Sequence, residues 1–212
     1  MKKLKIDQGE MPWLPEEIEY YDKYSSKNPV ARYLMNNFIK RLHRLIDMTD
    51  ATRIHEVGCG EGDLCIGLAE KGKTVHGTDL STDLLEKAKA KAREKGLPIG
   101  FRKSSIYDLN PDTDGADLIL CCEVLEHLQE PERALEKLHQ LANPYLITSV
   151  PREPLWSMLN LARGAYISRL GNTPAHVQTW SKSGFVKFVS QLFDIIKVES
   201  PTPWTLVLCR RK

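Results

Sequence analysis

The stretch IHEVGCGEGDL, residues 54–64, constrains the fold of this chain more than any other feature. It places Gly58, Gly60 and Gly62 at alternate positions, behind an apolar run and ahead of a segment with helical periodicity. Glycine at such positions lets the backbone turn sharply and approach a ligand more closely than a Cβ atom would permit. A helix that follows presents free N–H groups to the same place. The pattern predicts a strand, a tight turn and a helix, with a ligand held at the turn.

Short β-rich runs alternate with helical periodicity through most of the chain, which is typical of a doubly wound α/β fold with a mostly parallel sheet. A helix over 29–47 is predicted from an apolar stripe that includes Tyr33 and Phe38, with Pro29 in its first turn. Before residue 151 we expect five strands and three more helices. A polar turn is expected between the third strand and the fourth. The strands are expected at 52–57, 73–80, 99–104, 116–122 and 145–150, the helices at 62–72, at 81–96 and from Pro131, and the turn at 110–115. A last helix over 181–193 and two final strands complete a seven-stranded sheet.

The length and composition favour one compact domain over residues 1–212, because 42% of the residues are apolar and 27% are charged. Within it we expect an N-terminal helix at 28–50, a ligand-binding core at 51–150, a lid at 151–180, and a C-terminal helix and strands at 181–212. The lid is the simplest interpretation of a helical stretch rich in arginine and aromatic residues inserted before the last helix.

Charge and cysteine content narrow the possible partners. Thirty basic residues stand against 28 acidic ones, a balance that does not supply the field needed for non-specific nucleic-acid binding. No apolar window reaches the roughly 18 residues of a membrane span, and no signal peptide is recognised, so we expect a soluble cytoplasmic protein. The five cysteines form no CxxC pair and are expected to be reduced thiols, with Cys65 and Cys209 buried.

The spacing of the glycines bears on the ligand. Dinucleotide-binding turns use GxGxxG, whereas this turn reads GxGxG, and Glu56 and Glu61 beside it would repel a pyrophosphate. A nicotinamide-dependent oxidoreductase is therefore disfavoured. Asp79 follows Gly58 by 21 residues at the end of the next strand, where a carboxylate can bind both hydroxyls of a ribose. The ligand that these residues imply is a nucleoside joined to a cationic or zwitterionic amino acid.

Three segments, EVGCGEG, GTDLS and DLILCCEVLEHL, occur in the order and spacing of one family. Through them, residues 28–210 resemble the class I S-adenosylmethionine-dependent methyltransferases, which implies a Rossmann-like fold and S-adenosylmethionine as the cofactor. KNPVARYLM also resembles the N-terminal helix of the ubiquinone-biosynthesis O-methyltransferases. The cofactor-binding residues that these resemblances imply are Arg32, Glu56, Gly58, Cys59, Gly60, Gly62, Asp79, Leu80, Ser105, Ile106 and Cys122.

The resemblance assigns these residues to different parts of the cofactor. Glu56 and the glycines line the methionyl moiety, Asp79 and Leu80 hold the ribose, and Ser105 and Ile106 border the adenine. Many members have an aspartate where this chain has Ser105, so a hydroxyl or a main-chain carbonyl would hold the adenine amine instead. Cys122 would present its backbone to the methionyl amine, or merely pack. Arg32 would reach the cofactor carboxylate, or be an exposed helical arginine.

A second group of residues bears on the methyl acceptor. Methyl transfer requires alignment of the acceptor and, for a hydroxyl, removal of its proton. The pattern E-x-x-E-H followed by H-x-x-x-W is similar to the metal-dependent 2'-O-methyltransferases of small-RNA ends. That resemblance implies Mg²⁺ or Mn²⁺ bound by two carboxylates and two histidines, with an acceptor hydroxyl activated by the ion. The alternative is that the histidines act as bases, shape the pocket or cap a helix. The metal candidates are Glu123, Glu126, His127 and His176, and the two histidines are also the catalytic candidates.

The lid supplies rings and guanidinium groups that could enclose an aromatic or anionic small molecule. The alternative is that they are ordinary core and surface residues. They are Trp156, Tyr166 and Trp180 with Arg152, Arg163 and Arg169.

Together these features predict a methyltransferase that uses S-adenosylmethionine and acts on a small-molecule acceptor, with oxygen as the expected atom. The runner-up is a metal-dependent RNA 2'-O-methyltransferase. A third hypothesis is a catalytically silent cofactor-binding partner subunit. The sequence carries no signal for the oligomeric state.

Overall fold

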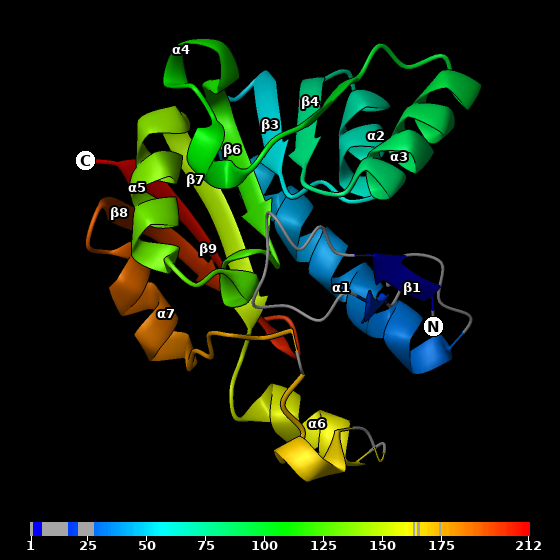
Figure 1. The fold of residues 1–212 in the computed structure, drawn as a ribbon. Coiled ribbons are helices and arrows are strands. Elements are labelled where there is room, and N and C mark those ends of the chain that lie inside the picture. Colours follow the sequence, from blue (N-terminus) through cyan, green and yellow to red (C-terminus); the bar gives the residue numbers. More distant parts are fainter. Residues whose placement is uncertain (1, 6–16, 21–27, 163, 165, 174) are drawn as a thin grey trace.

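The computed structural model describes residues 2–5, 17–20, 28–162, 164, 166–173 and 175–212, with side chains from residue 28 onward. A seven-stranded sheet in the order β5-β4-β3-β6-β7-β9-β8 forms its centre (Figure 1). Its strands are β3 (Arg53–Val57), β4 (Thr74–Asp79), β5 (Gly100–Lys103), β6 (Ala116–Cys122), β7 (Ala142–Pro151), β8 (Phe193–Glu199) and β9 (Trp204–Arg211). The first five are mutually parallel, and β9 runs antiparallel to both of its neighbours. The predicted mostly parallel, doubly wound α/β fold is confirmed.

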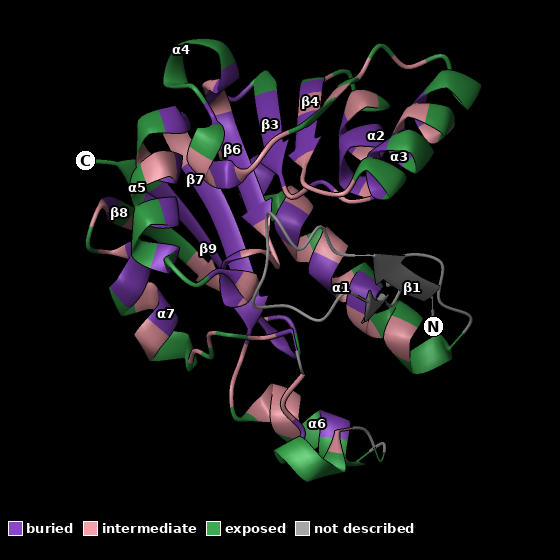
Figure 2. Ribbon diagram, viewed as in Figure 1, coloured by how far each residue is buried: buried purple, intermediate pink, exposed green. Residues whose placement is uncertain are grey.

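Helices cover both faces of this sheet. One apolar core joins one face to α1 (Pro29–Ile46), α2 (Asp63–Ala69) and α3 (Thr82–Glu94). A second core joins the other face to α5 (Pro131–Leu141) and α7 (Lys182–Val189). Figure 2 shows the buried strands between the two helical layers, whose outer surfaces are exposed. Because both faces are covered at the centre of the sheet, β6 reads as a nearly continuous apolar run, ADLILCC, in the sequence.

The start of α1 follows from its first residues. The Asn28 side chain accepts hydrogen bonds from the backbone N–H groups of Val30 and Ala31, and Pro29 takes a position that needs no donor. The predicted helix is confirmed, but its buried stripe begins at Met35. Tyr33, expected in that stripe, is 70% exposed. The spacing of the apolar residues predicts which face of the helix is buried. It does not predict the residue at which burial begins.

Two elements differ from the expectation. The predicted polar turn at 110–115 contains the one-turn helix α4 (Pro111–Asp114), whose first N–H groups are capped by Asn110. An antiparallel pair, β1 (Lys2–Lys5) with β2 (Glu17–Tyr20), was not predicted, because each strand has only four residues.

The segment 151–180 projects from the sheet as a separate lobe containing α6 (Leu155–Ala162) and the short helix η3 (Ile167–Arg169) (Figure 1). Its outer surface carries apolar side chains, among them Leu170, which is 79% exposed. Trp180 at the end of the segment lies instead against Phe185 and Phe188, with ring centroids 5.6 and 5.5 Å away. Of the lid aromatics, Trp180 is therefore a partly buried residue that packs against the core. Among the described helices, none is both long enough and apolar enough to cross a membrane.

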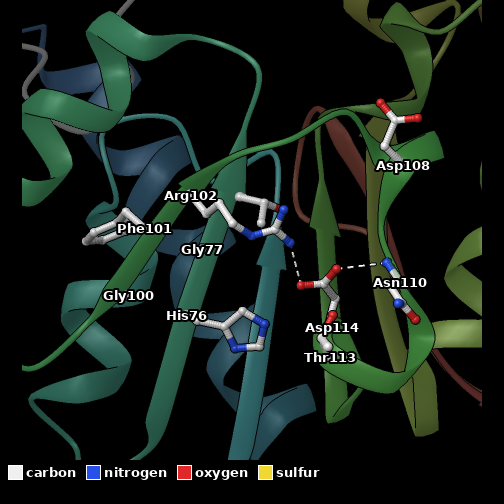
Figure 3. A pocket seen from close by; sticks show the side chains of 10 residues that line it. His76, Gly77, Gly100, Phe101, Arg102, Asp108, Asn110, Thr113 and Asp114 are labelled. Carbon is white, nitrogen blue, oxygen red and sulfur yellow. Dashed lines mark hydrogen bonds and ion pairs between the residues drawn. The ribbon is translucent and has the colours of Figure 1, made fainter.

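A cavity of about 530 Å³ lies on the face of β4 and β5, under the segment 108–114 (Figure 3). Beneath it the His55 and His76 rings stack with centroids 4.0 Å apart. Nδ1 of His55 lies 2.8 Å from the carbonyl oxygen of Asp114, and Nε2 lies 2.9 Å from the Thr78 hydroxyl. Arg102 pairs with the Asp114 carboxylate across the cavity. These contacts tie the 108–114 segment to the sheet.

His55 should make stability depend on pH. Burial, followed by the neighbouring His76, lowers the pKa of His55 to about 4. An unfolded chain binds this proton near pH 6.5, so falling pH favours unfolding by about 3 kcal/mol between pH 6.5 and pH 4. In urea unfolding, the advantage of the wild type over His55→Gln should shrink by that amount across this window. The same change at the half-buried His139 should give a smaller shift. An advantage over His55→Gln that stays constant with pH would contradict the prediction.

Candidate functional site

Three neighbouring strands end at the edge of the sheet where the predicted ligand residues lie. Because β4 and β6 pair in parallel with β3 on either side, their carboxyl ends meet at one edge. Val57, Asp79 and Cys122 are the last residues of these strands. In open α/β sheets, ligands bind beyond this edge, at the point where the strand order reverses.

The glycine turn has the left-handed backbone that its sequence predicts. The φ angles of Gly58, Gly60 and Gly62 are 77°, 53° and 75°. The N–H groups of Gly58 and Cys59 donate to the Thr78 carbonyl oxygen at 2.7 and 3.0 Å. A Cβ atom on Gly58 would lie 2.3 Å from a methyl carbon of Val124. Close packing as well as backbone conformation therefore requires glycine there.

Asp79 holds the turn from the neighbouring strand. Its carboxylate oxygens accept hydrogen bonds from the N–H groups of Gly60 and Ser81, each at 2.8 Å. Burial raises the pKa of Asp79, and these backbone donors partly oppose the shift. A carboxylate has about four lone-pair positions, so two backbone donors leave acceptor capacity for the hydroxyls of a ribose.

Glu56 lies beneath the turn and is 4% exposed. Its carboxylate accepts from the backbone N–H of Cys65 at 3.1 Å and from the Cys65 thiol at 2.9 Å. Because α2 has no side-chain cap at Gly62, Glu56 serves as an acceptor for the first turn of this helix. Burial raises the pKa of Glu56 to about 8. Near neutral pH the carboxyl is mostly protonated, and a nearby cation would favour its ionisation.

The expectation that Glu61 adds negative charge toward the ligand is wrong. Its buried carboxylate pairs with Lys87 at 3.2 Å and with Lys91 at 3.1 Å, both on α3. Burial would raise the pKa of Glu61, but hydrogen bonds from the two lysines outweigh it and lower the pKa. The charge of Glu61 is thus neutralised within the protein.

The other residues assigned to the cofactor lie at different depths. Ile106 is buried, and the Ser105 hydroxyl caps the short helix η1 (Ile106–Asp108) by accepting from the N–H of Tyr107 at 3.4 Å. Leu80 and Cys122 are half-buried, and Cys59 is buried. Arg32 is exposed on the first turn of α1, so its assignment remains a prediction.

Glu126, His127 and His176 form the second part of the site. One ligand atom from each lies within 4.8 Å of the others, and they are the group of metal-ligand type found among the described residues. Nδ1 of His127 lies 2.8 Å from the Ala175 carbonyl oxygen, an arrangement in which Nδ1–H donates and Nε2 carries the lone pair. Nε2 of His127 is 4.0 Å from the Glu126 carboxylate.

The lid is attached at this cluster. The N–H groups of Val177 and Gln178 donate to the Glu126 carbonyl oxygen at 2.8 and 3.0 Å. These bonds bring His176 to His127, with ring centroids 5.1 Å apart. Two segments far apart in the sequence therefore combine into one polar cluster.

Glu123, the fourth metal candidate, has other partners. Its carboxylate accepts from the Trp204 indole N–H at 2.6 Å and from the Ser149 hydroxyl at 3.1 Å. Trp204 and Ser149 were not predicted, because they lie on β9 and β7 and no local pattern connects them to Glu123.

The remaining lid residues divide between the site and the surface. The Trp156 ring lies 5.7 Å from the His176 ring and 6.4 Å from the Trp204 ring, so it faces the cluster. Arg152 and Tyr166 are half-buried and Arg169 is exposed, whereas Arg163 lies outside the described residues.

Comparison with known proteins agrees with this geometry. A family described as "Methyltransferase domain" matches residues 54–145. A ubiquinone biosynthesis O-methyltransferase of Chromobacterium violaceum is 30% identical over 194 residues, which cover 79% of this chain and 82% of that enzyme. The enzyme of the same name from Coxiella burnetii is 30% identical over 149 residues, and the match spans 63% of each chain. Magnesium protoporphyrin IX methyltransferase from Synechocystis PCC 6803, with bound SAH, has the same fold, with a TM-score of 0.71 at 21% identity over 89% of this chain and 90% of that one.

The fold and the glycine turn define a Rossmann-like methyltransferase domain. The chain belongs to the class I S-adenosylmethionine-dependent methyltransferases, as its similarity to the Chromobacterium violaceum enzyme shows.

Gly58→Ala should weaken cofactor binding, whereas Gly72→Ala should not. Both glycines have positive φ, so both substitutions incur backbone strain of about 1–2 kcal/mol. The methyl group added by Gly58→Ala would collide with Val124, whereas the space around Gly72 is open. Calorimetry with S-adenosylhomocysteine should show at least about a tenfold loss of affinity for Gly58→Ala, equal to about 1.4 kcal/mol. Adding Val124→Ala should recover part of that loss. Equal affinity for the two glycine variants would contradict the packing argument.

Proposed function

We propose that this chain transfers a methyl group from S-adenosylmethionine to an oxygen atom of a small-molecule acceptor. The observation that carries the proposal is the position of the glycine turn and Asp79, which share one sheet edge with the Glu126, His127 and His176 cluster. A cofactor held by the first group would present its methyl carbon toward the second. This placement suits a reaction in which alignment of the two reactants supplies much of the rate enhancement.

In this proposal, each part of the cofactor contacts a different strand end. The turn approaches the methionyl moiety closely because it carries no Cβ atom at Gly58 or Gly60. Asp79 accepts the ribose hydroxyls, and Ser105 and Ile106 border the adenine. The backbone at Cys122 would accept a hydrogen bond from the methionyl amine. Glu56 lies below the turn and offsets the sulfonium charge.

The acceptor that suits the site best is an aromatic ring with two neighbouring hydroxyls. The similarity to enzymes named for O-methylation in ubiquinone biosynthesis supports oxygen as the acceptor atom. Trp156, which lies beside His176, offers a flat surface on which such a ring can stack. Two neighbouring hydroxyls can also approach one polar cluster together.

Glu126, His127 and His176 would also suit a divalent cation. They offer one carboxylate oxygen and two imidazole nitrogens, and the hydrogen bond at Nδ1 orients His127 as metal-ligating histidines are oriented. When bound there, Mg²⁺ or Mn²⁺ would lower the pKa of an acceptor hydroxyl.

The chain's own residues suffice to describe the transfer. The acceptor oxygen forms a bond to the methyl carbon while the bond from that carbon to sulfur breaks, which leaves neutral S-adenosylhomocysteine. In the absence of an ion, the acceptor proton passes to Nε2 of His127, which then carries the lone pair needed for this role. The lid would exclude water from the reacting atoms.

The proposal predicts a loss of activity in two variants of the cluster. Radiolabelled S-adenosylmethionine should transfer its methyl group to a catechol-type acceptor in the presence of Mg²⁺. Glu126→Gln and His127→Asn should each lower kcat by at least about a hundredfold, the usual contribution of a positioned acid or base. His139→Asn, in the last turn of α5 beside Phe193, should retain full activity.

A metabolite and RNA extract from cells serves as the second acceptor pool. Label in RNA rather than in small molecules would overturn the proposal in favour of an RNA 2'-O-methyltransferase. Cofactor binding without label in either fraction would favour a silent partner subunit.

Because of Glu56, the preference in binding affinity for S-adenosylmethionine over S-adenosylhomocysteine should depend on pH. With a pKa of about 8, Glu56 gains its negative charge as the pH rises from 7 to 9. The charge attracts the sulfonium ion, which S-adenosylhomocysteine lacks, so the preference should increase across this range. A fall of about one unit in the pKa of Glu56 on binding corresponds to about tenfold in affinity. Glu56→Gln should remove the increase, and Glu61→Gln should preserve it. An equal increase in Glu56→Gln would assign the effect to another group.

A further inference from the structure

Glu123 has an unusual backbone for a side chain of its size. It follows the last residue of β6 and has a φ of 61°, in the left-handed region that non-glycine residues seldom occupy. Such a conformation persists where the surrounding contacts hold it, and it occurs most often at functional sites. The contacts of Glu123 therefore show which interactions hold its backbone in this conformation.

These contacts connect three strand ends. The backbone N–H of Glu123 donates to the Ser149 carbonyl oxygen at 3.0 Å, and the carboxylate accepts from the Ser149 hydroxyl at 3.1 Å. The second carboxylate oxygen accepts from the Trp204 indole N–H at 2.6 Å. Hydrogen bonds to a charged acceptor are shorter and stronger than neutral ones. Glu123 thereby ties the end of β6 to β7 and β9.

Trp204 passes this constraint to the lid. Its ring is 5% exposed, lies edge-on to Phe38 at 5.1 Å and faces Trp156 at 6.4 Å. Trp156 is fixed in turn by its indole N–H, which donates to the Thr173 hydroxyl at 3.0 Å. The Trp156 ring also lies 5.7 Å from the His176 ring, measured between centroids. A continuous series of contacts thus runs from Glu123 to a member of the polar cluster.

We infer that Glu123 is a positioning residue. Its carboxylate anchors Trp204, and Trp204 and Trp156 together set the His176 ring opposite His127. The inference rests on the proposed function, because it assigns the ion and the acceptor to Glu126, His127 and His176. The competing role for Glu123 is that of a fourth, direct ligand of the ion.

The two roles differ in what Trp204 should do. A positioning residue acts through its partner, so removing the partner's N–H has the same effect as removing the carboxylate. Trp204→Phe keeps an aromatic ring and removes that donor. A direct ligand would be unaffected by the change at Trp204. Glu123→Gln keeps a neutral acceptor oxygen, so it should retain part of the anchoring that Glu123→Ala loses.

The test uses nuclear magnetic resonance of the full chain with labelled tryptophan and histidine. Four tryptophans give four indole N–H signals, and Trp204→Phe identifies the one that belongs to Trp204. In Glu123→Ala this signal should shift upfield, with a smaller shift in Glu123→Gln. Both Glu123→Ala and Trp204→Phe should also move the His176 ring signals. Glu199→Gln, which removes a carboxylate paired with Arg41, should move neither. An unchanged Trp204 or His176 signal in Glu123→Ala would overturn the inference.

Ion binding and kinetics complete the test. Calorimetric titration with Mn²⁺ should give the same affinity, within about threefold, for the wild type and Glu123→Gln. A loss of about thirtyfold or more in Glu123→Gln with normal binding in Trp204→Phe would make Glu123 a ligand. Where methyl transfer is measurable, Glu123→Ala and Trp204→Phe should lower kcat alike, and the double variant should be no slower than either. Without measurable transfer the proposed function fails, and the resonance experiment still decides the role of Glu123.

Discussion

The hydrogen bonds between the end of β4 and the glycine turn are the constraint on which the rest of the site depends. Two consecutive residues of β4 satisfy three donors of the turn: Thr78 through its carbonyl oxygen, and Asp79 through its carboxylate. Buried N–H groups without acceptors would cost about 1–3 kcal/mol each, so the turn takes the shape that reaches these acceptors. The register of β4 on β3 thereby sets the positive φ angles at the glycines. It also sets where α2 begins, and hence which N–H groups Glu56 can cap.

The carboxyl groups around this turn show how one small region can hold several acids. Glu61 and Asp63 are neutralised by lysines of α3, and Asp79 is stabilised by backbone donors. Glu56 has a thiol and one backbone N–H as partners, and its pKa of about 8 reflects burial, which these two hydrogen bonds only partly offset. A positive charge added near Glu56 would therefore lower the pKa of this carboxyl and favour its ionised form. Only the environment in the fold distinguishes Glu56 from Glu61, since the two side chains are chemically equivalent.

The contacts that could be predicted from the sequence were those between residues close together along the chain. Local signals were sufficient for the glycine turn, for the Ser81 cap and for the strand 116–122, which the structure reproduces as β6. The partners of Glu61 lie 26 and 30 residues away, and the indole that Glu123 binds lies 81 residues away. Apolar periodicity indicates which face of an element is buried but not which charged groups meet there. The same limit applies to Trp180, whose core partners on α7 follow it but whose direction the pattern leaves open.

The ends of the lid and its outer part differ in what they contribute to the site. The contacts that place His176 belong to the ends of the lid, where residues 177 and 178 bond to Glu126 and Trp156 packs on Trp204. The outer part carries Met158, Ile167 and Leu170, which are largely exposed and contribute little to the position of His176. Changes in this outer part would therefore leave the polar cluster and the glycine turn in place. Because exposed connecting segments tolerate substitution better than the strands they join, the outer part of 151–180 can vary without loss of the geometry at the sheet edge.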